Sequence, residues 1–513
     1  MRLNQKTLRA DTFKNIQEAV AEQQQERADS LFNSEQENRV GRFILASTFQ
    51  CSPRWYNQKF QDAMAIVRYY HKPDLFITMT FDPKWSEIVS GLSPGQTPQD
   101  QPDLVAWVFK MKKDQLIHDL TTGGIFGQTL AFLWVIEFQK RGLPHAHILT
   151  IMADEDRPKT SNQVDQIVSA ELPPSPYEQG ISEEEKIRRK PLWDIVLNNM
   201  IHGPCGAQNP KAPCMENNKC TKNFPKPFQL ASMVDEQSSH PIYCRLSPED
   251  GGLTFVKNGK IIDNSWVVPY NPFLCLRFNC HINIEICSSP LAAKYLYKYV
   301  TKGPDRAMVS AEVGNDSAQA PRNEIRDYED MRYVGSSEAS WKLFAYPIAK
   351  NMPPVKVLRL HLENEQNVVF VGGEEEDVLE QGRETELTAF FRLNAQEKTD
   401  KGPDFNPAAM PLYVNMPESY TFSKKEWHIR KKGRSIGRVH TVNPLAGDVF
   451  YMRMLLHHDH CRGKTSFEDL MTIEGRVCDS YQAVCREIGL LSDDQEWSLV
   501  LTEAAGTQLC SQI

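Results

Sequence analysis

The stretch LAFLWVIEFQKRGLPHAHILT, residues 130–150, contains two apolar, β-favouring runs joined by a polar turn. This pattern predicts two antiparallel strands connected as a hairpin. Side chains at positions i and i+2 of a strand point to the same face, so His145 and His147 project together while Ala146 faces the other way. Folding of the hairpin can bring Glu137, at the end of the first run, beside the two imidazoles.

These three side chains favour a catalytic metal site. Two imidazole nitrogens and one carboxylate leave coordination positions open on a divalent ion, as a Lewis-acid catalyst requires. A lone histidine on a strand is more often a hydrogen-bonded core residue, but two histidines on one face beside a carboxylate favour an ion. The sequence therefore predicts a metal site made of Glu137, His145 and His147.

Composition limits the alternatives. The chain has 513 residues and a formal net charge of −8, so any contact with nucleic acid must come from local basic patches. The length suggests two to four domains. The charged amino-terminal segment and the lack of an apolar run of about 20 residues predict neither a secretion signal nor a membrane span. The 12 cysteines are therefore expected to be reduced thiols or metal ligands.

The order of apolar patterns around the hairpin predicts an α+β fold, with a central antiparallel sheet flanked by helices. Helical spacing of apolar residues alternates with short β-favouring runs in this part of the chain. We expect helices over residues 60–70 and 104–120, and strands over residues 75–81, 130–138 and 280–287. The strand at 280–287 and the helix after it are predicted to return to the same core.

A helix over residues 289–303 carries the second set of candidate catalytic residues. Helical geometry places Tyr295, Lys298, Tyr299 and Lys302 together on the face opposite the apolar stripe. A phenol is a weak nucleophile at neutral pH, but it can attack phosphorus when a metal polarises the phosphoryl oxygen and cations stabilise the charge. The alternative is that these are surface tyrosines on an amphipathic helix.

A short segment rich in glycine and proline contains His202, Cys205, Cys214 and Cys220. A polar loop of this length has little core of its own, so a structural Zn²⁺ would stabilise it. The spacing is irregular compared with the usual C-x₂-C pairs, in which two residues separate the cysteines. The sequence therefore leaves a zinc site and a set of buried free thiols as equal alternatives.

Two further motifs carry less information. The stretch GKTS, residues 463–466, resembles the end of a phosphate-binding loop, but His458 occupies the position where that loop needs a glycine. We therefore expect no ATPase motor in this chain. The basic run at 424–434 could bind a DNA backbone or could be a solvated face.

In combination, the motifs resemble the HUH endonucleases, and the fuller set resembles the Rep region of Helitron transposon proteins, which contains the "Helitron helicase-like" domain. The resemblance spans about residues 40–303. The matching stretches are FQDAMAIVRYYHKPDLFITMTFDPKW, WVIEFQKRGLPHAHIL, MIHGPCG, VVPYNPFL, CHINIEIC and KYLYKYVTKG.

The resemblance implies an HUH-type sheet and the following organisation. Residues 1–39 form a polar helical or disordered lead-in, residues 40–153 and 229–303 form the endonuclease domain, residues 154–228 form an insertion with the Cys/His module, and residues 304–513 form a mixed α/β carboxy-terminal region. That last region precedes the place of a Pif1-like, ATP-dependent helicase in full family members. We expect no helicase in this chain, so a helicase would have to be a partner.

The resemblance also implies an activity: nicking of single-stranded DNA in the nucleus, as in rolling-circle transposition. Tyr295 and Tyr299 match the family's paired nucleophiles, and Glu137, His145 and His147 match its ligands for Mg²⁺ or Mn²⁺. The products would be a 5′-phosphotyrosine and a free 3′-hydroxyl, with Lys298 and Lys302 as stabilisers of charge. The alternative is a catalytically inactive, transposon-derived DNA-binding protein.

Overall fold

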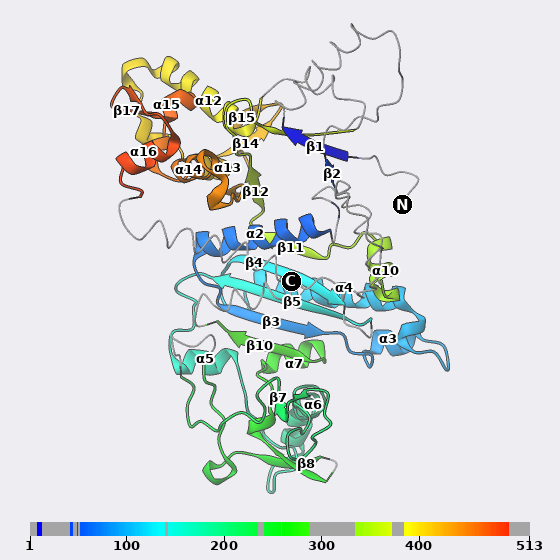
Figure 1. Ribbon diagram of the computed structural model, residues 1–513. Helices are drawn as coiled ribbons and strands as arrows, with labels where there is room; N and C mark the ends of the chain where they lie inside the picture. The colour runs from blue at the N-terminus through cyan, green and yellow to red at the C-terminus, as the bar shows by residue number, and fades with distance from the viewer. Residues whose placement is uncertain are drawn as a thin grey trace, which may run out of the picture. The chain divides into compact units, whose positions relative to one another are not determined.

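The structure is a computed structural model, and its helices and strands are labelled in Figure 1. It describes residues 8–12, 42–44, 49, 52–138, 142–233, 241–257, 259–287, 334–371 and 384–491. The chain divides into two compact units. The sheet unit comprises residues 66–306 and 333–352, and the second unit comprises residues 1–65, 307–332 and 353–513. The finer boundaries predicted from the sequence stay predictions.

The sheet unit is built on a five-stranded sheet with the strand order β10-β3-β5-β4-β11. Every neighbouring pair of strands is antiparallel. The strands are β10 (Ile282–Ile286), β3 (Leu75–Thr80), β5 (Pro144–Met152), β4 (Thr129–Phe138) and β11 (Ala349–Met352). The predicted hairpin is therefore present as β4 and β5, and the strands predicted at 75–81 and 280–287 are confirmed.

One face of this sheet is apolar and buried. Alternation along the strands places Met79, Ala146 and Ile136 side by side on this face, and all three are at most 4% exposed. Helix α4 (Pro102–Thr121) packs against the sheet, and the Nζ atom of its Lys113 lies 3.8 Å from the ring centroid of Trp134 on β4. The helix predicted at 104–120 is confirmed.

Three more helices contribute to the sheet unit. These are the end of α2 (Pro53–Tyr70), α3 (Ser86–Gly91) and α10 (Ser336–Leu343). The ring of Trp341 in α10 lies 6.2 Å from that of Phe109 in α4, and the indole of Trp85 donates a hydrogen bond of 2.8 Å to the carbonyl of Phe278. The protein is thus a mixed α+β structure in which helices flank an antiparallel sheet, as predicted.

A long insertion connects β5 to β10. It contains α5 (Ser161–Ile167), α6 (Glu183–Asn199), the hairpin of β6 (Met215–Glu216) and β7 (Lys219–Cys220), the hairpin of β8 (Thr254–Lys257) and β9 (Lys260–Asp263), and α7 (Pro272–Phe278). The buried Arg245 organises this loop-rich region, because its guanidinium donates hydrogen bonds to the carbonyls of Ala170, Asn264 and Val267.

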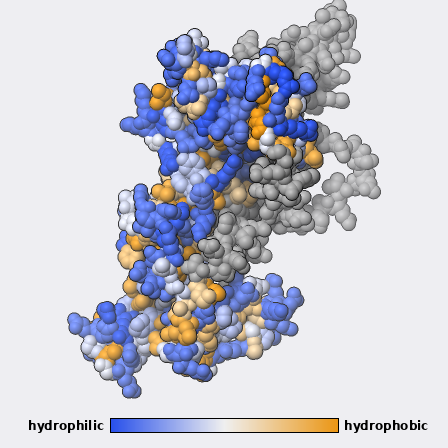
Figure 2. Space-filling view, turned by 90° about the vertical axis from the view of Figure 1, so that its left-hand side faces the viewer, coloured by the Kyte–Doolittle hydropathy of each residue, from blue (hydrophilic) through white to orange (hydrophobic). Residues whose placement is uncertain are grey.

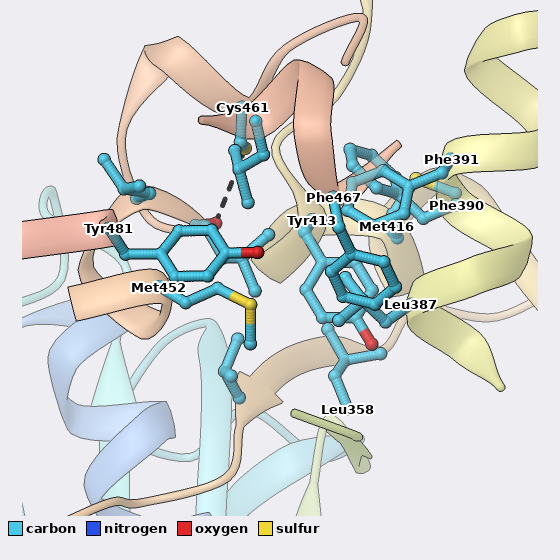
Figure 3. Packing of buried hydrophobic residues seen from close by; sticks show 14 of the residues in the cluster. Leu358, Leu387, Phe390, Phe391, Tyr413, Met416, Met452, Cys461, Phe467 and Tyr481 are labelled. Atoms are coloured by element: carbon cyan, nitrogen blue, oxygen red, sulfur yellow. Dashed lines mark hydrogen bonds between the residues drawn. The ribbon is translucent and has the colours of Figure 1, made fainter. Parts of the chain in front are cut away.

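The second unit has its own hydrophobic core, shown in Figure 3. Phe390 and Tyr413 are fully buried there with ring centroids 5.3 Å apart, and the Tyr413 hydroxyl donates to the carbonyl of Arg359. Within this unit, Arg438 of β16 (Ile436–Val439) forms an ion pair of 2.9 Å with Asp62 of α2.

The remaining helices and strands of the second unit are short, except for the 16-residue helix α12. They are β1 (Leu8–Thr12), β2 (Arg42–Ile44), β12 (Val355–Leu358), β13 (Asn367–Val371), α12 (Glu386–Lys401), α13 (Met416–Ser419), β14 (Tyr420–Ser423), β15 (Glu426–Ile429), α14 (Asp448–Leu455), α15 (Phe467–Leu470), β17 (Thr472–Ile473), β18 (Arg476–Val477) and α16 (Tyr481–Glu487). The basic run at 424–434 includes β15, which pairs with β14.

Hydrophilic residues cover most of the face shown in Figure 2, and the hydrophobic residues on it gather in small patches. Among the described residues, no helix combines the length and the apolar character needed to cross a membrane.

Candidate functional site

The second face of the sheet carries a row of polar residues that crosses four chain segments. Glu137 on β4 lies opposite His145 on β5, and His145 lies opposite Thr80 on β3. The row continues to His281, immediately before β10, because the backbone N–H of Thr80 donates to the carbonyl of His281 at 2.9 Å. The strand register thus aligns residues that are far apart in the sequence.

A second row lies one step further along the same face. His147 lies opposite Thr78, and Thr78 lies opposite Asn283 of β10. Residues two apart on a strand share a face, so His145 and His147 project together, as predicted. Their neighbours Ala146 and Ile148 are fully buried on the apolar face.

The side chains in these rows contact one another. Nε2 of His147 lies 2.9 Å from Oε2 of Glu137, and Nδ1 of His147 lies 3.1 Å from the hydroxyl of Thr78. The hydroxyl of Thr80 lies 3.4 Å from Nδ1 of His145 and also 3.4 Å from Nδ1 of His281. His147 is 3% exposed, so its contacts with Glu137 and Thr78 are shielded from solvent.

We name Glu137, His145 and His147 the sheet cluster. A threonine hydroxyl can donate or accept a hydrogen bond, so Thr78 can orient the His147 ring whichever nitrogen carries the proton. When Nδ1–H donates to Thr78, the lone pair of Nε2 becomes available to a metal ion. The ring centroids of His145 and His147 are 6.5 Å apart.

Sequence reasoning did not identify Thr78, Thr80 and His281 as part of this face. Burial lowers the pKa of His281 below its usual value of 6.5, which favours the neutral imidazole. A signal was present in the sequence, because Thr78 and Thr80 repeat the two-residue spacing of His145 and His147. Threonine is a common strand residue, however, and its position relative to the histidines depends on the pairing of distant strands.

The predicted nucleophiles lie outside the described residues. The described chain stops at residue 287 and resumes at residue 334, so it does not include Tyr295, Lys298, Tyr299 and Lys302. Their roles stay predictions.

The insertion brings His202, Cys205, Cys214 and Cys220 together, and we name these four residues the insertion cluster. Their donor atoms all lie within 4.8 Å of one another. Among the described residues, this is the one group of three or more His, Cys, Asp or Glu side chains whose donor atoms lie so close together. The insertion cluster could hold a metal ion. In the sheet cluster Nε2 of His147 and Oε2 of Glu137 are already 2.9 Å apart, so a bound ion would have to bring the donor of His145 closer to these two.

Local structure explains how the insertion cluster forms. Asn217 and Asn218 connect β6 to β7 and both adopt positive φ values, 49° and 62°, as a tight two-residue hairpin turn requires. The hairpin brings Cys214, just before β6, to Cys220 at the end of β7. The backbone N–H of Thr221 donates to the carbonyl of Cys214 at 2.8 Å.

The surroundings of the insertion cluster shift the pKa values of two of its side chains. Burial, together with the neighbouring Cys220 and Cys214 thiols, raises the pKa of Cys205 to about 12. Burial and the charges of Lys222 and Lys226 lower the pKa of His202 from 6.5. His202 is therefore neutral at physiological pH, which is the form that ligates metals, while Cys205 would release its proton on binding an ion.

Comparison with known families identifies the first part of the chain. Residues 1–150 match the family described as "Helitron helicase-like domain at N-terminus". The matched segment contains strands β3 and β4, β5 as far as Thr150, and all three residues of the sheet cluster. This part of the chain is Helitron-related, as the motifs predicted. A comparison with the curated proteins finds no match.

Proposed function

We propose that the protein nicks single-stranded DNA and transfers the cut strand through a 5′-phosphotyrosine, using an HUH-type metal site. The observation that carries this proposal is the placement of Glu137 beside His145 and His147 on one face of the sheet, inside the Helitron-related segment. A link to transposition follows from the family match, and the chemistry is our inference.

The donor set of the sheet cluster fits Mg²⁺ or Mn²⁺. One carboxylate and two imidazoles are donors that these ions accept, and three protein ligands leave positions for DNA oxygens. When bound, the ion would polarise a non-bridging phosphate oxygen. Thr78 and Thr80 contact the Nδ1 atoms of the two imidazoles, so they would hold the rings while Nε2 faces the ion.

The nucleophiles in this proposal are Tyr295 and Tyr299, which come from the resemblance. The phenol gives up its proton as its oxygen forms a bond to phosphorus, the bond from phosphorus to the 3′-oxygen breaks, and that oxygen takes up a proton to give a free 3′-hydroxyl. Lys298 and Lys302 would stabilise the charge that develops on the phosphate. The phosphotyrosine conserves the energy of the bond, so rejoining needs no ATP. Two tyrosines allow one protein to hold two strand ends.

A labelled oligonucleotide tests this proposal. We expect a covalent protein–DNA adduct that requires Mn²⁺ or Mg²⁺ and that is lost in the double variant Tyr295→Phe, Tyr299→Phe. An adduct that survives in the double variant would assign the nucleophile elsewhere. DNA binding without any adduct in the wild-type chain would favour the alternative, a catalytically inactive DNA-binding protein.

The nuclear location and the helicase partner are two further parts of the proposal, and each has its own test. Imaging of the tagged chain tests the nuclear location, and co-purification tests a Pif1-like helicase partner.

A further inference from the structure

We propose that the insertion cluster binds one structural Zn²⁺ through His202, Cys205, Cys214 and Cys220, and that this ion holds the fold of the insertion. The inference does not depend on the nicking activity, because the insertion cluster shares no residue with the sheet cluster. It rests on the geometry of the four donors, on the groups that orient them, and on the size of the local hydrophobic core.

The four donor atoms already have a spacing close to that of a tetrahedral zinc site. Zn–S bonds of about 2.3 Å in a tetrahedron place the sulfur atoms about 3.8 Å apart. The donors here lie within 4.8 Å of one another, and Nε2 of His202 lies 3.5 Å from Sγ of Cys220. Small side-chain movements would therefore complete the coordination.

Neighbouring groups orient these donors toward a common point. The His202 ring stacks on Phe224, with centroids 4.3 Å apart and planes 12° apart, so the ring is fixed with Nε2 toward Cys220. The backbone N–H of Lys222 points at Sγ of Cys220 over 3.4 Å. An amide that donates to sulfur stabilises a thiolate, which is the form of cysteine that binds zinc.

The donor chemistry selects zinc. Three thiolates and one imidazole are soft or borderline ligands, and such sets bind Zn²⁺ in closed tetrahedral structural sites. Mg²⁺ and Mn²⁺ prefer oxygen donors, which the insertion cluster does not supply. The insertion cluster therefore favours Zn²⁺ over Mg²⁺ and Mn²⁺.

The hydrophobic core around the insertion cluster is small. Its buried members are Cys205, Ala212, Cys220, Ile262 and Trp266, and two of these five are themselves ligands. Partly buried residues, among them Ile201, Phe224 and Phe255, pack against this core. A core of this size offsets only part of the conformational entropy of ordering the loop-rich segment. A zinc ion binds the folded segment much more tightly than the unfolded one, so its binding energy stabilises the fold.

Metal analysis of the purified full-length chain tests the proposal. We expect about one equivalent of zinc that a thiol-specific reagent releases. Replacement by Co²⁺ should give the thiolate-to-cobalt charge-transfer absorption of a tetrahedral site with sulfur ligands. The absence of metal with thiolate ligands in the wild-type chain, or a disulfide among Cys205, Cys214 and Cys220, would overturn the proposal.

A pair of serine variants locates the ion. Cys214 is the least buried of the three thiols, so Cys214→Ser should lose the zinc with the least damage to packing. The matched control is Cys244→Ser, a partly buried thiol of the same insertion outside the cluster, which should keep the full equivalent. Glu137→Gln should also keep it, which separates this result from any result at the sheet cluster. Equal zinc content in Cys214→Ser and Cys244→Ser would reject the assignment.

Discussion

The sheet cluster and the insertion cluster position metal ligands in opposite ways. The register of β3, β4 and β5 fixes Glu137, His145 and His147 on a sheet whose other face is fully packed. Loops and a two-strand hairpin carry the insertion cluster around a core of five buried residues. In the first region strand pairing and packing would hold the fold without an ion, and in the second region the ion would complete the fold. Four experiments test whether the two regions differ in this way.

Removal of all metal should affect the two regions very differently. After treatment with a strong chelator, we expect amide hydrogen exchange across residues 201–228 to accelerate by at least about 100-fold, because structural zinc sites contribute about 10–16 kcal/mol of apparent binding energy. Strands β3, β4 and β5 should keep their protection. Zinc added back should restore the insertion. Equal loss of protection in both regions would break the contrast.

Replacement of the carboxylate of the sheet cluster should remove activity and preserve the fold. We expect Glu137→Gln to slow adduct formation by at least about 100-fold, or about 2.7 kcal/mol, because an amide is a poor ligand for Mg²⁺ or Mn²⁺. The thermal midpoint should change little, since glutamine can still accept a hydrogen bond from His147. The control is Glu155→Gln, an exposed carboxylate after the end of β5. Equal rates in the two variants would contradict the role of Glu137.

The threonines beside the histidines should act by positioning. We expect Thr78→Val to weaken Mn²⁺ binding about tenfold in calorimetry, because groups that orient metal ligands have effects of roughly this size. Thr150→Val is the matched control: its hydroxyl is buried on β5 and has no hydrogen-bond partner among the residues that the structure describes. Valine there should leave Mn²⁺ affinity unchanged and should not destabilise the chain. Identical affinities in the two variants would show that Thr78 does not position His147.

The turn of the β6–β7 hairpin should give the smallest effect. Asn218 has a φ of 62°, a conformation that alanine adopts at a cost of about 1 kcal/mol. Asn218→Ala should therefore weaken zinc binding several-fold in a competition titration. Asn218→Gly should keep the wild-type affinity, because glycine adopts positive φ readily. A loss of affinity in the glycine variant would point to the side chain instead of the backbone.

Local patterns were sufficient to predict the core of the sheet unit. Alternation and the turn residues identify β4 and β5, and the register that follows places Glu137 opposite His145. The role of Thr78 could not be predicted, because it depends on the pairing of β3 with β5 across 69 residues of sequence. Helices α5 and α6 lie in the segment at 154–228, for which the sequence predicted an insertion but no helices. Their capping residues, Thr160 and Ser182, were visible signals.

The residue types alone identified the four members of the insertion cluster, but they did not predict how closely the donor atoms converge. The interval between Cys214 and Cys220 does not match the usual spacing of zinc ligands. The hairpin turn at Asn217 and Asn218 removes this difficulty, since it folds the interval back on itself. The choice between zinc and free thiols could not be made from spacing, because it depends on how closely the donor atoms converge.

The hairpin of β4 and β5 also has a consequence for the order of assembly on the ribosome. Glu137 and His147 are 10 residues apart in the chain, whereas Thr80 and His281 are separated by 201 residues. Contacts between near neighbours close with little loss of entropy, and distant ones close late. A nascent chain can therefore form the ligand-bearing hairpin long before β10 is synthesised, and the edge strand then adds His281 to a constellation that already exists.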